Sequence, residues 1–170
     1  MTDKIYVIGH KSPDTDSVTS AITYANLKNA LGMKEAVPAA AGDINAETKF
    51  LLDHFKVPYP EKLTDATDKK VILVDHNEMA QAVDNLNMEN IVEIVDHHKI
   101  GGLATGKPIF FLNEPVGATG GIIANLYEMN NVPISKEMAG LMMSAILSDT
   151  VLFKSPTCTP RDKTAVEKLA

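Results

Sequence analysis

Three short apolar runs rich in β-branched residues constrain the fold of this chain more than any other feature. They lie at residues 4–9, 70–75 and 91–96. The first two are almost continuously apolar, which is typical of strands covered on both faces. Apolar residues recur at helical spacing in four further stretches, at residues 16–31, 44–55, 119–129 and 136–147. Because strands and helices alternate, the sequence predicts an α/β fold, a mostly parallel β-sheet with helices on both faces.

The composition fits one domain of ordinary size. The chain has 170 residues, 45% of them hydrophobic, and a formal net charge of −6. The acidic balance argues against a basic nucleic-acid-binding face, and no apolar run is long enough to span a bilayer. The N-terminus lacks the apolar stretch of a signal peptide. From the charge and the run lengths we expect no binding to nucleic acid or membrane. Because the single cysteine, Cys158, cannot form an internal disulfide, we expect a cytoplasmic protein.

Acidic and imidazole side chains follow all three predicted strands, and a fourth acidic segment, Ser148-Asp149-Thr150, follows a predicted helix. Parallel strands present their carboxyl ends at one edge of a sheet, where ligands bind in open α/β folds. We therefore expect a single cluster at that edge. Its predicted members are His10, Asp14, Asp16, Asp75, Asp96, His97 and His98, with Asp149 joining from its helix end.

Such a cluster needs positive charge, because carboxylates at close range raise each other's pKa. Divalent cations supply that charge, and mixed Asp and His ligands suit Mn, Co, Zn or Mg. Two ions bridged by one carboxylate can stabilise both the attacking and the leaving oxygen in phosphoryl hydrolysis. A single Asp-His pair is weak evidence for a metal site, because such pairs also occur by chance. Asp53-His54 is an example: it lies within a predicted helix with no strand before it, and we expect it on a solvated helix face. The four segments together predict metal binding.

Two glycine-rich segments are not expected to bind phosphate. Residues 101–107 fit the first part of a P-loop, but Pro108 stands where Ser or Thr is needed, and residues 109–112 favour a strand over a helix. We expect a surface loop there. Gly117, Gly120 and Gly121 open a predicted helix, and we expect them to allow close packing.

Taken together, the four acidic segments resemble the motifs of the DHH phosphoesterase superfamily. The motifs are Gly9-His10-x3-Asp14-x-Asp16-Ser17, Asp75-His76-Asn77, Asp96-His97-His98 and Ser148-Asp149-Thr150. Within that superfamily the chain is most similar to the family II, manganese-dependent inorganic pyrophosphatases, and the resemblance covers essentially the whole chain. It implies hydrolysis of pyrophosphate to two orthophosphates by a metal-bridging hydroxide, without a covalent enzyme intermediate.

The resemblance implies two Mn²⁺ ions in the site, with Co²⁺ or Mg²⁺ as substitutes. One ion would be held by His10 and Asp14, and the other by Asp16 and His97. Asp75 would bridge both ions. The full set of implied metal ligands is His10, Asp14, Asp16, Asp75, His97 and Asp149.

The remaining roles also follow from the resemblance. His98 would contact the substrate, and the groups implied in catalysis are Asp75, His98 and Asp149. The side chains expected to orient the ligands are His76, Asn77 and Asp96. A homodimer formed through this domain by edge-strand pairing is implied as well.

Members of that family continue into a second, C-terminal domain whose Arg-Lys-Lys segment and further lysine grip the substrate phosphates. We expect residues 1–160 to form the DHH catalytic, metal-binding domain and residues 161–170 to begin the interdomain linker helix. The alternative is a terminal helix packed back on the domain. The resemblance implies that this N-terminal domain alone binds its metals but is weakly active or inactive, because the missing cations would stabilise transition-state charge.

Two other functions stay open at this point. One is a DHH phosphodiesterase acting on short oligonucleotides or cyclic dinucleotides, which would share the metal chemistry. The chain has no Trp and is acidic, which disfavours a platform for bases. The other is a metal-binding dimerisation module without catalysis as isolated.

Overall fold

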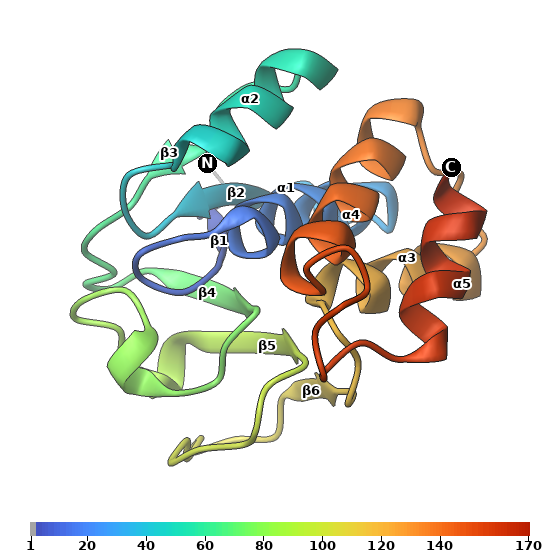
Figure 1. Cartoon of the computed structure of the whole chain (residues 1–170). Helices are drawn as coiled ribbons and strands as arrows, with labels where there is room; N and C mark the ends of the chain where they lie inside the picture. The colour runs from blue at the N-terminus through green and yellow to red at the C-terminus, as the bar shows by residue number, and fades with distance from the viewer. Residues whose placement is uncertain (1–2) are drawn as a thin grey trace.

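A six-stranded, wholly parallel β-sheet forms the centre of the molecule (Figure 1). The computed structural model describes residues 3–170. The strands lie in the order β3-β2-β1-β4-β5-β6. Their bounds are Ile5–Ile8 (β1), Ala36–Ala40 (β2), Glu61–Lys62 (β3), Lys70–Val74 (β4), Ile91–Asp96 (β5) and Phe110–Asn113 (β6). The α/β class and the parallel sheet predicted from the sequence are confirmed.

Five α-helices complete the fold, and all five were indicated by the apolar spacing. They are Thr15–Ala30 (α1), Ala46–Phe55 (α2), Thr119–Met129 (α3), Lys136–Asp149 (α4) and Pro160–Leu169 (α5). Two 3₁₀ helices, Met79–Gln81 (η1) and Met88–Asn90 (η2), lie between β4 and β5. Among the described residues, no helix is long and apolar enough to cross a membrane.

The two faces of the sheet are covered differently. Alternate strand residues point to opposite faces, so Val7 packs into the apolar cluster that contains residues of α1 to α4, whereas Ile8 faces the other cluster. On that second face the covering residues come from the connections between strands, including Leu63 and Ala66 before β4 and Val83 and Leu86 between η1 and η2. The α-helices therefore line one face, and the short 3₁₀ helices and loops line the other.

Strands β2 and β3 are not predicted by the sequence analysis. Strand β2 reads Ala-Val-Pro-Ala-Ala, with one β-branched residue and a proline, Pro38, whose missing N–H weakens any strand signal. Strand β3 has only two residues, both exposed. Both strands lie toward one edge of the sheet, away from the β4–β5 side.

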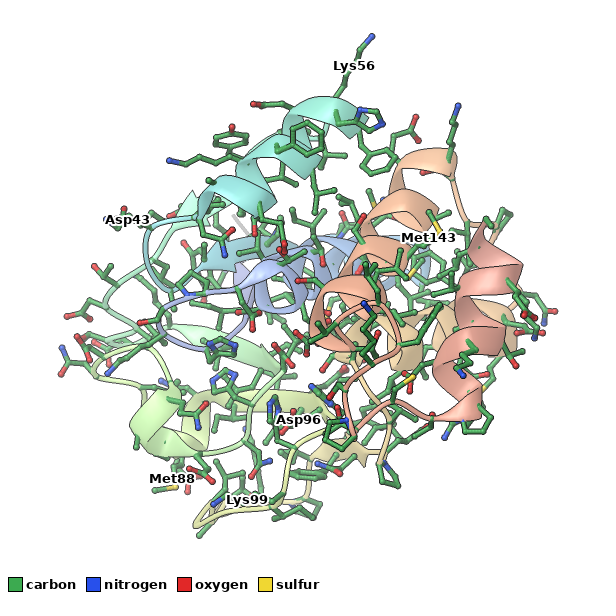
Figure 2. All side chains as sticks on the ribbon, viewed as in Figure 1. Asp43, Lys56, Met88, Asp96, Lys99 and Met143 are labelled. Carbon is green, nitrogen blue, oxygen red and sulfur yellow. The ribbon has the colours of Figure 1, made fainter. Side chains whose placement is uncertain are left out.

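Helix α5 packs back on the domain beside α3 and α4 (Figure 1). Its Asp162 is buried, and both carboxylate oxygens accept the Gly117 N–H, each at 3.0 Å. Asp162 Oδ2 also accepts the Thr159 N–H at 2.7 Å. A helix is therefore present at this end of the chain, as expected, and it is fixed through a buried carboxylate; its role as the start of an interdomain linker stays a prediction. Lys56, which follows the last residue of α2, projects away from the body of the protein (Figure 2).

Close packing between α3 and α4 depends on Gly120. A Cβ at this position would lie 2.8 Å from Ala145 Cβ and 3.1 Å from the Met142 carbonyl oxygen. At the adjacent Gly121 the nearest atoms would be 3.7 Å away or farther, which is ordinary contact. A side chain at position 120 would therefore clash, whereas position 121 has room for one. The expected role of Gly120 in close packing is confirmed.

We predict that Gly120→Ala lowers the free energy of unfolding by about 1–3 kcal/mol, because a backbone carbonyl cannot move out of the way of the new methyl group. Gly121→Ala is the matched control and should be neutral or stabilising by up to about 1 kcal/mol, since Ala favours helix. Thermal denaturation measures both, at about 2–4 °C per kcal/mol for a chain of this size. Equal midpoints for the two variants would contradict the packing argument.

Candidate metal centre

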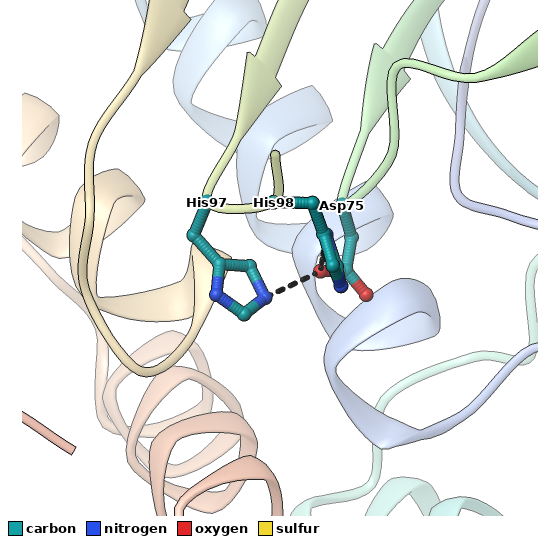
Figure 3. Close-up of side chains that lie close together, drawn as sticks. All are labelled: Asp75, His97 and His98. Atoms are coloured by element: carbon teal, nitrogen blue, oxygen red, sulfur yellow. Dashed lines mark ion pairs between the residues drawn. The ribbon is translucent and has the colours of Figure 1, made fainter. Parts of the chain in front are cut away.

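The predicted site residues meet at the carboxyl end of the sheet, where three neighbouring strands end. His10 follows β1, Asp75 follows β4, and His97 and His98 follow β5. Figure 3 shows Asp75 and the two histidines reaching toward one another from the ends of adjacent strands. The parallel order β1-β4-β5 places the three segments side by side although they are far apart in the sequence.

Asp75 lies at the centre of this cluster. Its Oδ2 is 3.3 Å from His10 Nε2, and its Oδ1 is 3.1 Å from His97 Nε2. The residue is buried and has a left-handed backbone with φ 61°, which a non-glycine residue adopts at an energetic cost. The Thr119 hydroxyl donates a hydrogen bond to Asp75 Oδ1 at 3.1 Å. The fold thus holds this carboxylate between two imidazoles.

The cluster divides into groups of potential metal ligands that all include Asp75. Within each group the donor atoms lie within 4.8 Å of one another. The first group contains His10, Asp14 and Asp75, and the second contains Asp16, Asp75, His97 and Asp149. A third combination joins His98 to Asp75 and His97. The structure therefore brings all six predicted ligands together as two sets that share one carboxylate.

Backbone carbonyls orient the two histidines of these sets. His10 Nδ1 lies 2.7 Å from the Lys11 carbonyl oxygen, and His97 Nδ1 lies 2.9 Å from that of Val116. These contacts place the Nδ1 proton on the carbonyl side and leave each Nε2 directed at the carboxylates, which is the usual arrangement of a metal-binding histidine.

Two buried atoms in the cluster have no hydrogen-bond partner. They are His97 Nε2 and Asp75 Oδ2. Buried polar atoms are almost always paired. His97 Nε2 faces Asp75 Oδ1, and Asp75 Oδ2 faces His10, so the two unpartnered atoms fit cations placed on either side of the Asp75 carboxylate. The donor set of the chain therefore suits divalent metal ions.

Helix starts hold the two carboxylates of the first motif. Asp14 is the N-cap of α1 and accepts the Ser17 N–H at 2.9 Å. Asp16 accepts the N–H groups of Thr119 and Gly120 at 2.8 and 2.9 Å, so the first turn of α3 binds it. Sequence reasoning missed this use of α3, and the only available signal was the Thr-Gly-Gly start of that helix.

His98 and Asp96 form a separate pair beside the cluster. His98 Nδ1 lies 2.8 Å from Asp96 Oδ1, and the His98 side chain is 46% exposed, so it faces the open side of the site. Asn77 donates to Asp96 Oδ2 at 2.6 Å and to the Lys99 carbonyl at 2.9 Å. Asp96 and Asn77 thus fix His98 and the loop that follows it.

His76 lies beneath the cluster, not among the ligands. Its Nδ1 is 2.8 Å from the Val74 carbonyl oxygen, and its ring stands edge-on to His10 at 6.3 Å between centroids. Burial lowers the pKa of this imidazole. By contrast, the Asp53-His54 pair is exposed on α2, as expected for a solvated helix face.

The cluster raises the pKa of both His10 and His97. Burial alone would lower the pKa of His10, but the facing carboxylates of Asp14 and Asp75 raise it to about 11. Burial likewise opposes the charge on His97, whose pKa Asp149 and Asp75 raise to about 11. In the metal-free protein both imidazoles are therefore protonated at neutral pH, and protons carry the positive charge that the carboxylates need.

The carboxylates divide into two kinds. Burial and the charges of Asp75 and Asp149 raise the pKa of Asp16 well above its usual range, and burial also raises that of Asp149. Burial opposes ionisation of Asp75 too, but the facing His10 and His97 hold its pKa below the usual value. Among the carboxylates of the potential ligand groups, Asp75 is therefore the one most strongly kept in its charged form.

A family description, the N-terminal domain of the DHH family, matches residues 4–146. The chain belongs to the DHH family. The matched range includes every segment of the site except the one that carries Asp149.

Relatives with high identity are named as pyrophosphatases. The chain is 75% identical over 170 residues to the manganese-dependent inorganic pyrophosphatase of Methanothrix thermoacetophila, a match that covers 100% of this chain and 55% of the relative. It is 47% identical to the protein of the same name from Bacillus subtilis, over 99% of this chain and 55% of that one. The chain thus spans about half the length of these relatives.

Solved structures agree with the fold. A crystal structure of a candidate family II inorganic pyrophosphatase from Methanococcus jannaschii superposes with a TM-score of 0.87 at 45% identity, covering 97% of this chain and 55% of that one. An exopolyphosphatase-related protein from Bacteroides fragilis is 17% identical and gives a TM-score of 0.70 over 98% of this chain and 52% of that one. The second likeness shows the fold alone.

We predict that Mn²⁺ binding to this chain releases protons, because each ion displaces the proton that a histidine carries below its raised pKa. The apparent affinity should therefore rise between pH 6 and pH 8, by up to about tenfold per pH unit for each proton released. Calorimetry in buffers of different ionisation enthalpy counts these protons.

The control is His54→Ala, which removes an exposed imidazole on α2 and should leave the proton count unchanged. His10→Ala should lower it. An affinity that does not change with pH would contradict the assignment of His10 and His97 as protonated ligands.

Proposed function

We propose that this chain carries the dinuclear manganese site of an inorganic pyrophosphatase and acts in the hydrolysis of pyrophosphate to two orthophosphates. The observation that carries the proposal is the pair of ligand groups that share Asp75. The names of the relatives from Methanothrix and Bacillus support it. The same names support Mn²⁺ as the resident metal, and two ligand groups fit two ions.

The roles proposed for the residues follow from their positions. When bound, two divalent ions would supply Lewis acidity, activate water and offset the charge of the phosphates. Asp75 would hold both ions, and Asp149 would complete the second ligand group. His98, fixed by Asp96 and half exposed, would donate a hydrogen bond from its free Nε2 to a substrate phosphate oxygen.

The pyrophosphatase activity of this chain by itself is proposed to be weak. Two lysines follow ligand motifs, but each is already paired: Lys11 with Asp84 at 2.6 Å and Lys99 with Glu78 at 3.6 Å. The negative charge of bound pyrophosphate would then be neutralised mainly by the metal ions. The curated relatives extend well beyond the matched region, and we propose that further cations come from that part of them.

Assembly and location stay predictions. Strand β6 is the longer of the two edge strands, and its Phe110 is 48% exposed, which supports dimerisation by pairing of two β6 strands. The molar mass in solution tests this. The single cysteine supports the proposed cytoplasmic location.

The test compares this chain with a hybrid in which it is joined to the C-terminal part of the Methanothrix relative. With Mn²⁺, we expect the hybrid to release phosphate from pyrophosphate, and the 170-residue chain alone to do so on the order of 100-fold more slowly or worse, since a lost charge-stabilising group costs that much. Asp75→Asn in the hybrid should lower kcat by a similar factor or more.

Asp53→Asn is the matched control, because it changes the same Asp-His dipeptide outside the site, and its kcat should equal that of the hybrid. Cleavage of a dinucleotide but not of pyrophosphate would overturn the proposal in favour of a phosphodiesterase. A hybrid that binds Mn²⁺ and cleaves neither substrate would favour a non-catalytic module.

A further inference from the structure

Glu47 connects two of the helix ends that supply metal ligands, although it is not itself among the ligand groups of the described residues. It lies in the first turn of α2, which contributes no residue to those groups. Its Oε1 accepts hydrogen bonds from the Thr15 hydroxyl and, at 2.6 Å, from the Ser148 hydroxyl. One carboxylate oxygen therefore joins α1 to α4.

Both hydroxyl donors are immediate neighbours of metal ligands. Thr15 stands between Asp14 and Asp16 at the start of α1, and Ser148 precedes Asp149 at the end of α4. Asp149 is the last residue of its helix, and a left-handed turn over residues 151–153 follows it. Helix ends have the fewest internal hydrogen bonds, so the position of Asp149 depends on contacts of this kind.

The N-terminus of α2 is itself held in place, which makes Glu47 a fixed acceptor. Asn45 caps the helix by accepting the Thr48 N–H at 2.8 Å. The buried Thr48 hydroxyl lies 3.0 Å from that of Thr15, which adds a second link between α2 and α1. Favourable charge at a helix N-terminus would explain an acidic residue at position 47, but it does not explain two hydroxyl groups that converge on one oxygen.

We infer that Glu47 is a positioning residue for the second ligand group, the one formed by Asp16, Asp75, His97 and Asp149. It acts through Ser148 and Thr15, and it sets the separation between the carboxylates of Asp149 and Asp16. The inference rests on the proposed function only in taking this cluster as a metal centre. Residues that orient metal ligands typically contribute about 10–100-fold to metal affinity.

The test is stepwise Mn²⁺ titration of the full chain by calorimetry. Asp149→Asn identifies the step that belongs to the second ligand group. Glu47→Ala should weaken that same step by about 10–100-fold, while the step assigned to His10 and Asp14 changes by less than about threefold. Ser148→Ala should weaken the same step, and the double variant should lose no more than Glu47→Ala, because the two side chains act as one unit.

Two further variants separate positioning from other effects. Glu47→Gln keeps an oxygen that can accept both hydroxyl groups, so it should keep the affinity of the second step within about threefold. Glu137→Ala removes the equivalent first-turn acid from α4 and should change neither step. The metal-free thermal midpoint of each variant shows whether the fold has changed.

The outcomes distinguish this inference from the function proposed above. If the unsubstituted chain takes up no Mn²⁺, the metal centre and the positioning role both fail. If it takes up two ions and Glu47→Ala binds both unchanged, only the positioning role fails. Equal losses in Glu47→Ala and Glu47→Gln would show that charge, not hydrogen bonding, is what matters, and would also overturn the inference.

Discussion

The buried Asp75 carboxylate is the constraint on which the rest of the site depends. A carboxylate removed from water is costly unless positive charge or hydrogen-bond donors face it. Here one oxygen faces the His97 imidazole and accepts one hydroxyl, and the other faces the His10 imidazole and has no hydrogen-bond partner among the described residues. The strand ends and the left-handed backbone at Asp75 place this charge between His10 and His97, and the carboxylates around these two imidazoles raise their pKa.

The location of the acidic residues matters more than the net charge of the chain. A net charge of −6 would disfavour an anionic substrate if it were spread over the surface. Part of it is instead concentrated in the carboxylates of the potential ligand groups, and cations bound there would reverse the local field. Around that centre the chain uses helix starts for support: α1 presents Asp14 and Asp16, α3 binds Asp16 through its first amides, and α2 supplies Glu47.

The sequence predicts the sheet and the cluster well because both have local signals. An apolar run followed by Asp and His can be recognised in the amino-acid sequence, and the parallel topology of the sheet then brings Asp75 and His97 together. Strand β2 escapes prediction because alanines and Pro38 carry no β signal. The Thr119 and Gly120 amides and the Val116 carbonyl also escape it, since any residue offers the same backbone groups and only the tertiary fold shows which ones face Asp16 or His97.

The most direct measurement of the shared-carboxylate geometry is anomalous scattering from crystals of this chain soaked in Mn²⁺. We expect two anomalous peaks about 3.5–4 Å apart, as in two-metal phosphoryl-transfer sites. They should lie on either side of the Asp75 carboxylate, one within coordination distance of His10 Nε2 and the other of His97 Nε2. A single peak, or two peaks that do not both contact Asp75, would contradict that geometry.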